Sequence, residues 1–398
     1  MNGRLPLERR QWALPVLGAV VLLVWLLAGW SLPQQALLSY LLAYVFWTGL
    51  TLGSLALVMV HALTGGAWGE SIRPQLLAAA RTLPLQALLV LPILFGMRIL
   101  YPWTQPEVLA GDAQLRAQAW YLDGSFFVIR TIVWFVLWLG MWLALERRLA
   151  DPARLPHLQR LAGPGLIVYS LTMSLAATDW VMSLLPHWHS SIFGMLVVTG
   201  QMLAAAALAT WIATRRARAE PAPPGLLCDL GNLLLMFVLA WTYLAFMQYL
   251  TVWIADLPAE TNWYIPRTLT TWRWLAWFLI AFQFVVPFAI LLSQRAKRAA
   301  RWLGAVAAML LVASVAHALW LVVPNFRPQG FAIRWTDPLA VLGIGMLWVF
   351  LYAGQLRAVP LTPWPSPPQL SRGSRRPGTE ASKGSPGRAN PPRERDRG

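Results

Sequence analysis

The sequence predicts an all-α polytopic membrane protein. Its composition is 58% hydrophobic and only 12% charged, with a mean hydropathy of +0.53. Apolar runs of about 20 residues recur along the chain, and a helix of this length crosses the roughly 30 Å hydrocarbon layer of a bilayer. The short alternating segments of a membrane β-barrel are not found. The 24 tryptophans and 9 tyrosines suit aromatic belts at both membrane surfaces.

About ten transmembrane helices follow from these runs. The first run, from Trp12 to Trp30, comes after a basic N-terminus and imitates a signal peptide. It is long and lacks a convincing small-residue cleavage site, so we expect an uncleaved span. The predicted spans are about 12–30, 36–63, 75–97, 125–146, 163–184, 191–214, 226–254, 269–294, 301–323 and 337–356.

The basic residues predict the orientation. Sixteen Arg and Lys residues fall on one side of this map and six on the other. The positive-inside rule therefore places both termini in the cytoplasm. The chain divides into a cytoplasmic N-terminus at 1–11, a transmembrane helical domain at 12–356 and a tail at 357–398. This basic Pro-, Arg- and Ser-rich tail has too little apolar content to fold, so we expect it to be disordered. The net charge of +16 thus reflects topology, and we expect a lipid membrane and no nucleic acid as partner.

Polar residues at membrane depth form the candidate functional site. An ionisable group at this depth costs roughly 2.5–3.5 kcal/mol on insertion scales, which favours a functional role. The candidates near the predicted outer face are Asp179, His187, His189, Arg130 and His317. Those near the predicted inner face are His61, Arg81, Glu146 and Asp229. Between the two levels lie Gln201, Tyr243, Gln248 and Gln283.

Two titratable clusters joined by neutral hydrogen-bonding residues predict a proton path. The competing interpretation is structural, because Gln and Tyr in membrane helices often only bond neighbouring helices together. For Gln201, Gln283 and Tyr243 taken singly, the structural interpretation is favoured. For Asp179 the functional one is favoured, because an Asp at depth cannot reach the membrane surface easily.

Cofactor chemistry within the chain is limited by its ligands. The single cysteine, Cys228, excludes a disulfide framework, a Cys-ligated cluster and covalent c-type haem attachment. A haem b needs two facing histidines at similar depth, whereas His61 and His317 belong to opposite faces. His187 and His189 are two residues apart beside a proline and do not share one helix face. We therefore expect no metal and no cofactor bound within this chain.

One stretch carries a family resemblance. The segments DWVMSL at 179–184, PHW at 186–188 and SSIFG at 190–194 resemble the signature of the ActF subunit of alternative complex III. That complex is a bacterial quinol:cytochrome c (or other electron-acceptor) oxidoreductase, and ActF belongs to the NrfD/polysulfide-reductase membrane-subunit superfamily. Further segments that resemble this family are 100–103, 126–130, 229–231, 241–250, 257–261, 320–324 and 343–345. The resemblance covers about 36–356.

The resemblance implies an architecture and a set of partners. The architecture is two four-helix bundles, spans 2–5 and 6–9, flanked by spans 1 and 10. The partners in the bacterial cytoplasmic (inner) membrane are an ActC-like paralogue, an iron–sulfur subunit and c-type cytochromes, with a terminal oxidase as a further candidate. Iron–sulfur clusters and haem c lie in those partners, and a quinone is the one small molecule this chain itself could bind.

Three positions depart from the family pattern. Leu185 stands where an acidic residue is expected, and His189 where an aromatic residue is usual. His317 replaces an acid if span 9 is aligned as we expect. The acid lost at 185, together with the histidines at 189 and 317, would retune the outer cluster towards neutral pH.

Three functional hypotheses follow. The leading one is a membrane subunit of a respiratory quinol:electron-acceptor oxidoreductase that contributes to proton conduction and is not catalytic alone. The second is a quinol-binding catalytic subunit like ActC, because Asp and His together accept both hydrogen bonds and protons. The third is a secondary transporter. Pro287 could break span 8 as in transporters, but no internal repeat is visible.

Overall fold

The computed structural model describes residues 7–149 and 158–358. Within these ranges every regular element is a helix, and nine helical segments are long and apolar enough to cross a membrane. This is the architecture of a polytopic α-helical membrane protein, as the sequence predicts. The nine segments are Pro33–Thr64, Ala67–Phe95, Gly124–Leu149, Leu158–Leu184, Phe193–Ala219, Leu226–Ala255, Arg273–Leu292, Ala300–Asn325 and Thr336–Ala358.

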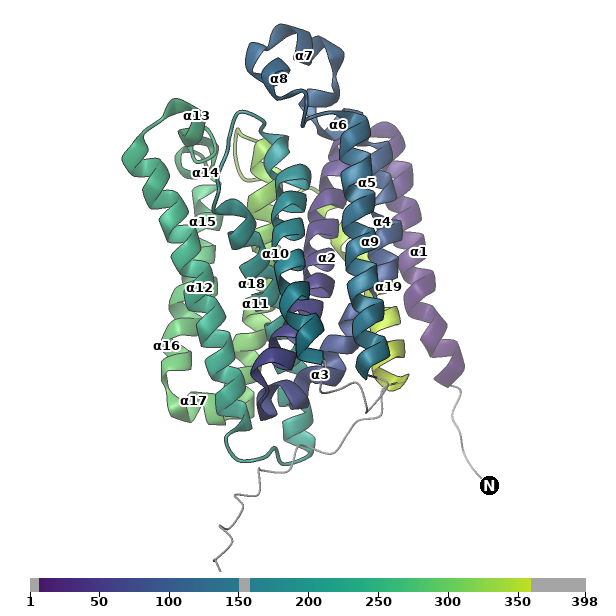
Figure 1. Cartoon of the computed structure of the whole chain (residues 1–398), viewed down its shortest axis with the longest axis vertical. Helices are drawn as coiled ribbons and strands as arrows, with labels where there is room; N and C mark the ends of the chain where they lie inside the picture. The colour runs from purple at the N-terminus through teal and green to yellow at the C-terminus, as the bar shows by residue number, and fades with distance from the viewer. Residues whose placement is uncertain (1–6, 150–157, 359–398) are drawn as a thin grey trace, which may run out of the picture. The chain divides into compact units, whose positions relative to one another are not determined.

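The first predicted span corresponds to α1, Leu7–Ser31, whose apolar part is the shorter stretch Val16–Ser31. Seven of the other spans contain one long continuous helix. These are α2 (Pro33–Thr64), α9 (Gly124–Leu149), α10 (Leu158–Trp180), α11 (Phe193–Ala219), α12 (Leu226–Ala255), α18 (Ala300–Val322) and α19 (Thr336–Ala358) (Figure 1). The segment before residue 7, Arg154 and the basic tail after residue 358 lie outside the described residues.

The third span is segmented, although the sequence predicted one helix over 75–97. It consists of α3 (Ala67–Ala80), α4 (Leu83–Leu89), α5 (Leu91–Phe95) and α6 (Met97–Leu100). Pro84 and Pro92 lie in the first turns of α4 and α5. A proline has no N–H to donate and its ring clashes with the preceding turn, so the helix restarts at each one.

The eighth span contains a π-helical segment. It runs as α15 (Arg273–Leu279), the π-helix η4 (Ile280–Val285) and α16 (Val286–Leu292). Pro287 is in the first turn of α16, directly after the widened turns. Isolated π-helical turns are rare and frequently accompany functional sites. The helix break that Pro287 suggested in span 8 is therefore a change of helical pitch. Gln283 lies within this π-helical segment.

Short helices lie at the ends of the spans. Figure 1 shows α7, α8, α13 and α14 at one end, which we call the α8 end, and α3 and α17 at the other, the α17 end. The short elements are η1 (Pro102–Thr104), α7 (Pro106–Gly111), α8 (Ala113–Gln118), η3 (Met182–Leu184), α13 (Pro258–Thr261), α14 (Ile265–Leu269), α17 (Gln294–Arg298) and η5 (Val323–Asn325).

Helix contacts fall into two groups. In the first, α2 packs against α3, α4 and α10, and α9 packs against α10. In the second, α11 packs against α12 and α18, and α12 packs against α16. The groups meet where α11 contacts α2 and α10, while α1 pairs with α19. Gly53 permits the α2–α11 contact, because a Cβ there would overlap the carbonyl oxygen of Gln201.

Candidate functional site

Asp179 of α10 and Arg130 of α9 form a buried ion pair. Arg130 Nε donates to Asp179 Oδ2 and Nη2 to Oδ1, both at 2.9 Å. Its Nη1 also donates to the Tyr121 carbonyl at 2.8 Å, and the guanidinium lies over the rings of Tyr121 and Phe126. Asp179 is 0% exposed and Arg130 6%. The structure thus brings these two predicted residues together, and both carboxylate oxygens are held by one cation.

His187 and His189 lie in the turn between η3 and α11 and contact α8. His187 Nε2 is 2.8 Å from Asp112 Oδ2, and its Nδ1 is 3.1 Å from Gln114 Oε1. His189 Nε2 is 3.4 Å from Gln118 Nε2. Within the described residues, neither histidine has a hydrogen bond or ion pair with Asp179. The two predicted histidines therefore hold the α8 segment and do not extend the buried ion pair.

Asp112 is a partner that the sequence argument did not assign. It precedes α8 and accepts hydrogen bonds from the backbone N–H groups of Leu115 and Gln114. These two N–H groups, Leu115 first, and then the His187 ring hold the pKa of Asp112 below its usual range. An Asp that precedes a short helix is a common N-cap, so the sequence carried a local signal for this role.

His189 also borders a cavity of about 450 Å³ between α10 and α12. Gln248 and Glu260 line it as well. Gln248 joins two elements here, since its Oε1 accepts from Ser190 Oγ at 3.3 Å and its Nε2 donates to the Tyr264 hydroxyl at 3.2 Å. The cavity thus has an imidazole, a carboxylate and an amide on its wall.

His317 and Gln201 lie together in the interior. Both line a small cavity of about 40 Å³ at the contact of α2, α11 and α18. Tyr169 of α10 donates its hydroxyl to Gln201 Oε1 at 2.9 Å. The His317 ring packs edge-on against Trp241, with ring centroids 5.1 Å apart. The sequence grouped His317 with Asp179, whereas the structure places it beside one of the predicted connecting residues.

The predicted inner residues divide among three places. Arg81 and Glu146 form a two-bonded ion pair at 2.7 and 2.8 Å, each with about a quarter of its side chain exposed. His61 Nε2 is 3.2 Å from the Gly66 carbonyl at the end of α2. Asp229 is exposed in the first turn of α12. No hydrogen bond or ion pair among the described residues joins His61 or Asp229 to the Arg81–Glu146 pair.

The remaining connecting residues differ in burial. Tyr243 of α12 is 59% exposed and lies on the rim of a large cavity. Gln283 of the π-helix is 1% exposed, and its Oε1 has no hydrogen-bond partner within the described residues. A buried amide oxygen without a partner is costly, so this position differs from the satisfied Gln201.

The large cavity measures about 870 Å³ and lies between α12, α14, α15 and α18. His317 stands on its wall as well as on that of the small cavity. Its aromatic lining residues are Trp241, Tyr243, Phe246, Tyr249, Trp263, Tyr264, Trp277, Phe284 and Trp320. The sequence did not predict this cavity, because α14 folds in from a segment that was taken for a loop.

Arg267 of α14 was counted only as a topology residue and is in fact fully buried. Its guanidinium donates to the carbonyls of Trp263, Trp320 and Leu321 and to Asn325 Oδ1. The guanidinium carbon lies 3.4 Å from the centre of the Trp263 ring. All these partners are neutral.

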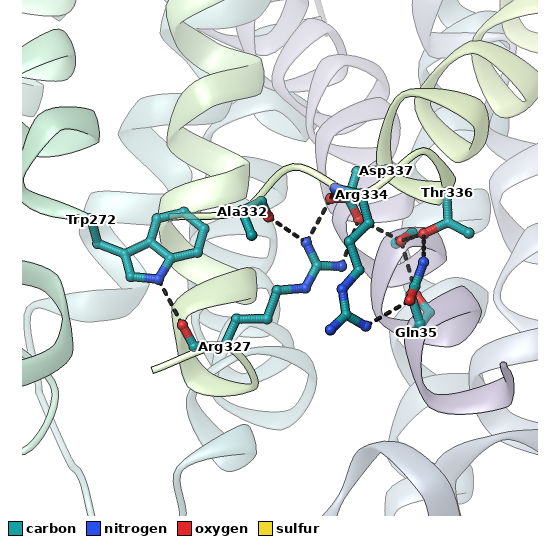
Figure 2. Close-up of polar contacts among 8 residues, drawn as sticks. Gln35, Trp272, Arg327, Ala332, Arg334, Thr336 and Asp337 are labelled. Carbon is teal, nitrogen blue, oxygen red and sulfur yellow. Dashed lines mark hydrogen bonds and ion pairs between the residues drawn. The ribbon is translucent and has the colours of Figure 1, made fainter. Parts of the chain in front are cut away.

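Arg327 and Asp337 form a second buried ion pair that the sequence argument missed (Figure 2). Arg327 Nη1 donates to Asp337 Oδ2 at 2.7 Å, and Nη2 to Oδ1 at 3.0 Å. Asp337 also accepts from the backbone N–H of Arg334 and from Ser39 Oγ of α2. It lies in the first turn of α19, where the helix dipole stabilises a carboxylate. The signal for this ion pair in the sequence was an Asp before Pro338 at the start of a predicted span.

Among the described residues, no group of three His, Cys, Asp or Glu side chains is placed to hold a metal ion. No protein-family model matches the chain, and no significant match occurs among curated proteins. The candidate functional site is therefore assigned from the side chains and cavities of this chain.

Proposed function

We propose that this chain is the membrane subunit of a respiratory quinol:electron-acceptor oxidoreductase similar to alternative complex III, and that it conducts protons there. The resemblance of 179–194 and of the further segments to ActF supports the assignment. In this proposal both termini face the cytoplasm of a bacterium, as the sixteen-to-six distribution of basic residues favours. An ActC-like paralogue, an iron–sulfur subunit and c-type cytochromes would carry the electron chemistry.

The position of His317 is the observation that carries the proposal. A neutral imidazole accepts a proton on one nitrogen and releases one from the other. Its ring lines the large cavity on one side and the 40 Å³ cavity on the other. The small cavity exceeds the roughly 10–15 Å³ that one water needs, and Gln201 supplies a polar partner for that water. Tyr169 of α10 donates to Gln201, so a water between His317 and Gln201 would complete a hydrogen-bonded chain towards α10.

Asp179 has a different role in this proposal. Both carboxylate oxygens of Asp179 accept short hydrogen bonds from Arg130, so this group is poorly placed to pass a proton to another acceptor. Its contribution would be to hold α9 and α10 together, along with the Tyr121 carbonyl that Arg130 also contacts. The proton-transfer role that depth alone suggested for Asp179 therefore passes to His317.

Replacing His317 by Leu in the assembled complex tests the proposal. We expect coupled proton release to fall about 10²-fold, the lower range for loss of a general acid–base group. Assembly and the KM for quinol should stay unchanged. The matched control is Trp241→Phe, which keeps an aromatic ring against the same site and should retain activity. Normal proton release in the His317→Leu variant would contradict the proposal.

Purification tests the assignment to an assembly. The tagged chain should come out of membranes with iron–sulfur and multihaem partners. Isolation of the chain alone under mild extraction would contradict a subunit role and favour the transporter hypothesis.

The 450 Å³ cavity favours a second candidate function, quinol binding by this chain. His189, Glu260 and Gln248 could accept hydrogen bonds from the two hydroxyls of a quinol, and the first two could take their protons. Replacing His189 by Leu should then raise the KM for quinol, whereas the His317→Leu variant should not. An unchanged KM in both variants would leave proton conduction as the only role of this chain.

A further inference from the structure

The large cavity has the depth of one membrane leaflet. On α12 its wall runs from Leu239 to Tyr249. Ten helical residues rise about 15 Å, which is half of the roughly 30 Å hydrocarbon thickness. Arg267 and Thr268 of α14 line the cavity at the α8 end, and Ile280 and Phe284 lie deeper in span 8. The cavity thus begins at one membrane surface and reaches the middle of the bilayer.

The α8 end of this cavity carries positive charge without a balancing acid. Arg267 and Arg273 both line it, and no Asp or Glu is among its lining residues. No ion pair among the described residues includes either arginine. Burial lowers the pKa of Arg267 well below its usual range, and only the Tyr264 phenol opposes this. An anion beside the guanidinium would remove that penalty.

Tyr264 supplies a hydrogen-bond donor next to these charges. Burial raises the pKa of its phenol to about 12, so the group stays protonated at neutral pH. The phenol oxygen already accepts from Gln248 Nε2. Its own hydrogen is therefore left for another acceptor in the cavity.

We propose that this cavity binds one anionic phospholipid, with its phosphate against Arg273 and Tyr264, close to the buried charge of Arg267, and an acyl chain along the aromatic wall towards His317. The phosphate would offset one of the two positive charges, and a charge-assisted hydrogen bond from the phenol adds direction. The aromatic wall matches a hydrocarbon chain in polarity and length. A neutral quinone would fill the wall but leave both arginines unbalanced. The inference is independent of the proposed respiratory function.

Lipid binding can be measured on the full chain in detergent, with whatever partners co-purify. Native mass spectrometry should find one anionic phospholipid retained per chain. After delipidation, short-chain phosphatidylglycerol should raise the thermal midpoint, whereas phosphatidylcholine and inorganic phosphate should not. Arg273→Gln should weaken the phosphatidylglycerol effect about fivefold, the contribution of one basic residue near an anionic lipid.

Two further variants separate binding from folding. Ala276→Phe should abolish retention by filling the cavity while both arginines remain. Arg116→Gln removes the same charge from the exposed surface of α8 and should retain the lipid. Arg267 itself is left intact, because its hydrogen bonds hold α14 to α18. A retained quinone, an equal response to phosphatidylcholine, or a full response to inorganic phosphate would each overturn the proposal.

Discussion

The two helix groups differ in how their charged side chains are paired. In the group around α2, α9 and α10, charged side chains at depth are paired, as Arg130 is with Asp179 and Arg81 with Glu146. In the group around α11, α12 and α18, Arg267, His317 and Gln283 have no carboxylate partner among the described residues. These three groups accompany cavities or a π-helical turn.

This difference separates structural charges from candidate functional ones. A buried charge is costly unless it is paired. The ion pairs of the group around α2, α9 and α10 therefore hold its helices in a fixed arrangement. An uncompensated polar group beside a cavity has its cost reduced only when water or a ligand enters. Depth in the membrane alone made Asp179 the leading candidate for a functional residue. The lack of ion pairs and the presence of cavities instead favour candidates in the group around α11, α12 and α18.

Breaking the buried pair should give the largest effect. Asp179→Asn removes the charge that balances Arg130 at a site with almost no solvent. We expect the free energy of unfolding to fall by about 3–5 kcal/mol, the usual cost of leaving one buried partner alone. Thermal unfolding of the full chain in detergent measures this loss.

The double variant Arg130→Met with Asp179→Leu is the control, because it removes both charges together. It should recover most of the lost stability, as apolar replacements of buried pairs commonly do. An Asp179→Asn variant as stable as the wild type would show that the pair is not structural, and would return Asp179 to the candidates for proton transfer.

The spans were predictable because their length is a local property. The run that became α9 was placed at 125–146 and is helical over Gly124–Leu149, since bilayer thickness alone sets how many apolar residues are needed. The interruptions at Pro84 and Pro92 were not predicted, although proline gave the signal. A helix restart inside an apolar run is missed when spans are assigned by hydropathy, because hydropathy does not depend on whether a residue has a backbone N–H.

Which residues contact one another was less predictable than how deep each residue lies in the membrane. The Arg130–Asp179 pair could be guessed from two charges at similar depth on neighbouring spans. The contact of His317 with the cavity of Gln201 joins residues 116 positions apart, and the helix rotations that bring them together depend on packing. Arg267 was hidden for another reason. It belongs to a loop by composition, yet α14 folds inward and buries it.

Gln283 offers a smaller test in the second group. Replacing it by Leu removes a buried amide oxygen that has no partner, so stability should be unchanged or raised by up to about 1 kcal/mol. Gln201→Leu is the matched control, because it leaves the Tyr169 hydroxyl without its acceptor and should cost about 1–3 kcal/mol. Thermal midpoints of both variants provide the comparison. If Gln283→Leu costs as much as Gln201→Leu, the distinction between a satisfied and an unsatisfied buried amide fails.

The smallest effect should come from Asp112, which contacts His187 near solvent. Its folded pKa is lowered, so it contributes stability above its usual pKa of 3.8 and loses it as the pH falls through the folded value. Asp112→Ala should therefore lower the thermal midpoint by no more than about 2 °C at pH 7, as surface changes do. The difference should shrink as the pH falls below 3.8. Glu107→Ala, on the neighbouring α7, is the control and should show no such loss. A deficit of Asp112→Ala that does not shrink as the pH falls below 3.8 would mean that the carboxylate charge is not its cause, and that pairing stabilises this protein only where water is excluded.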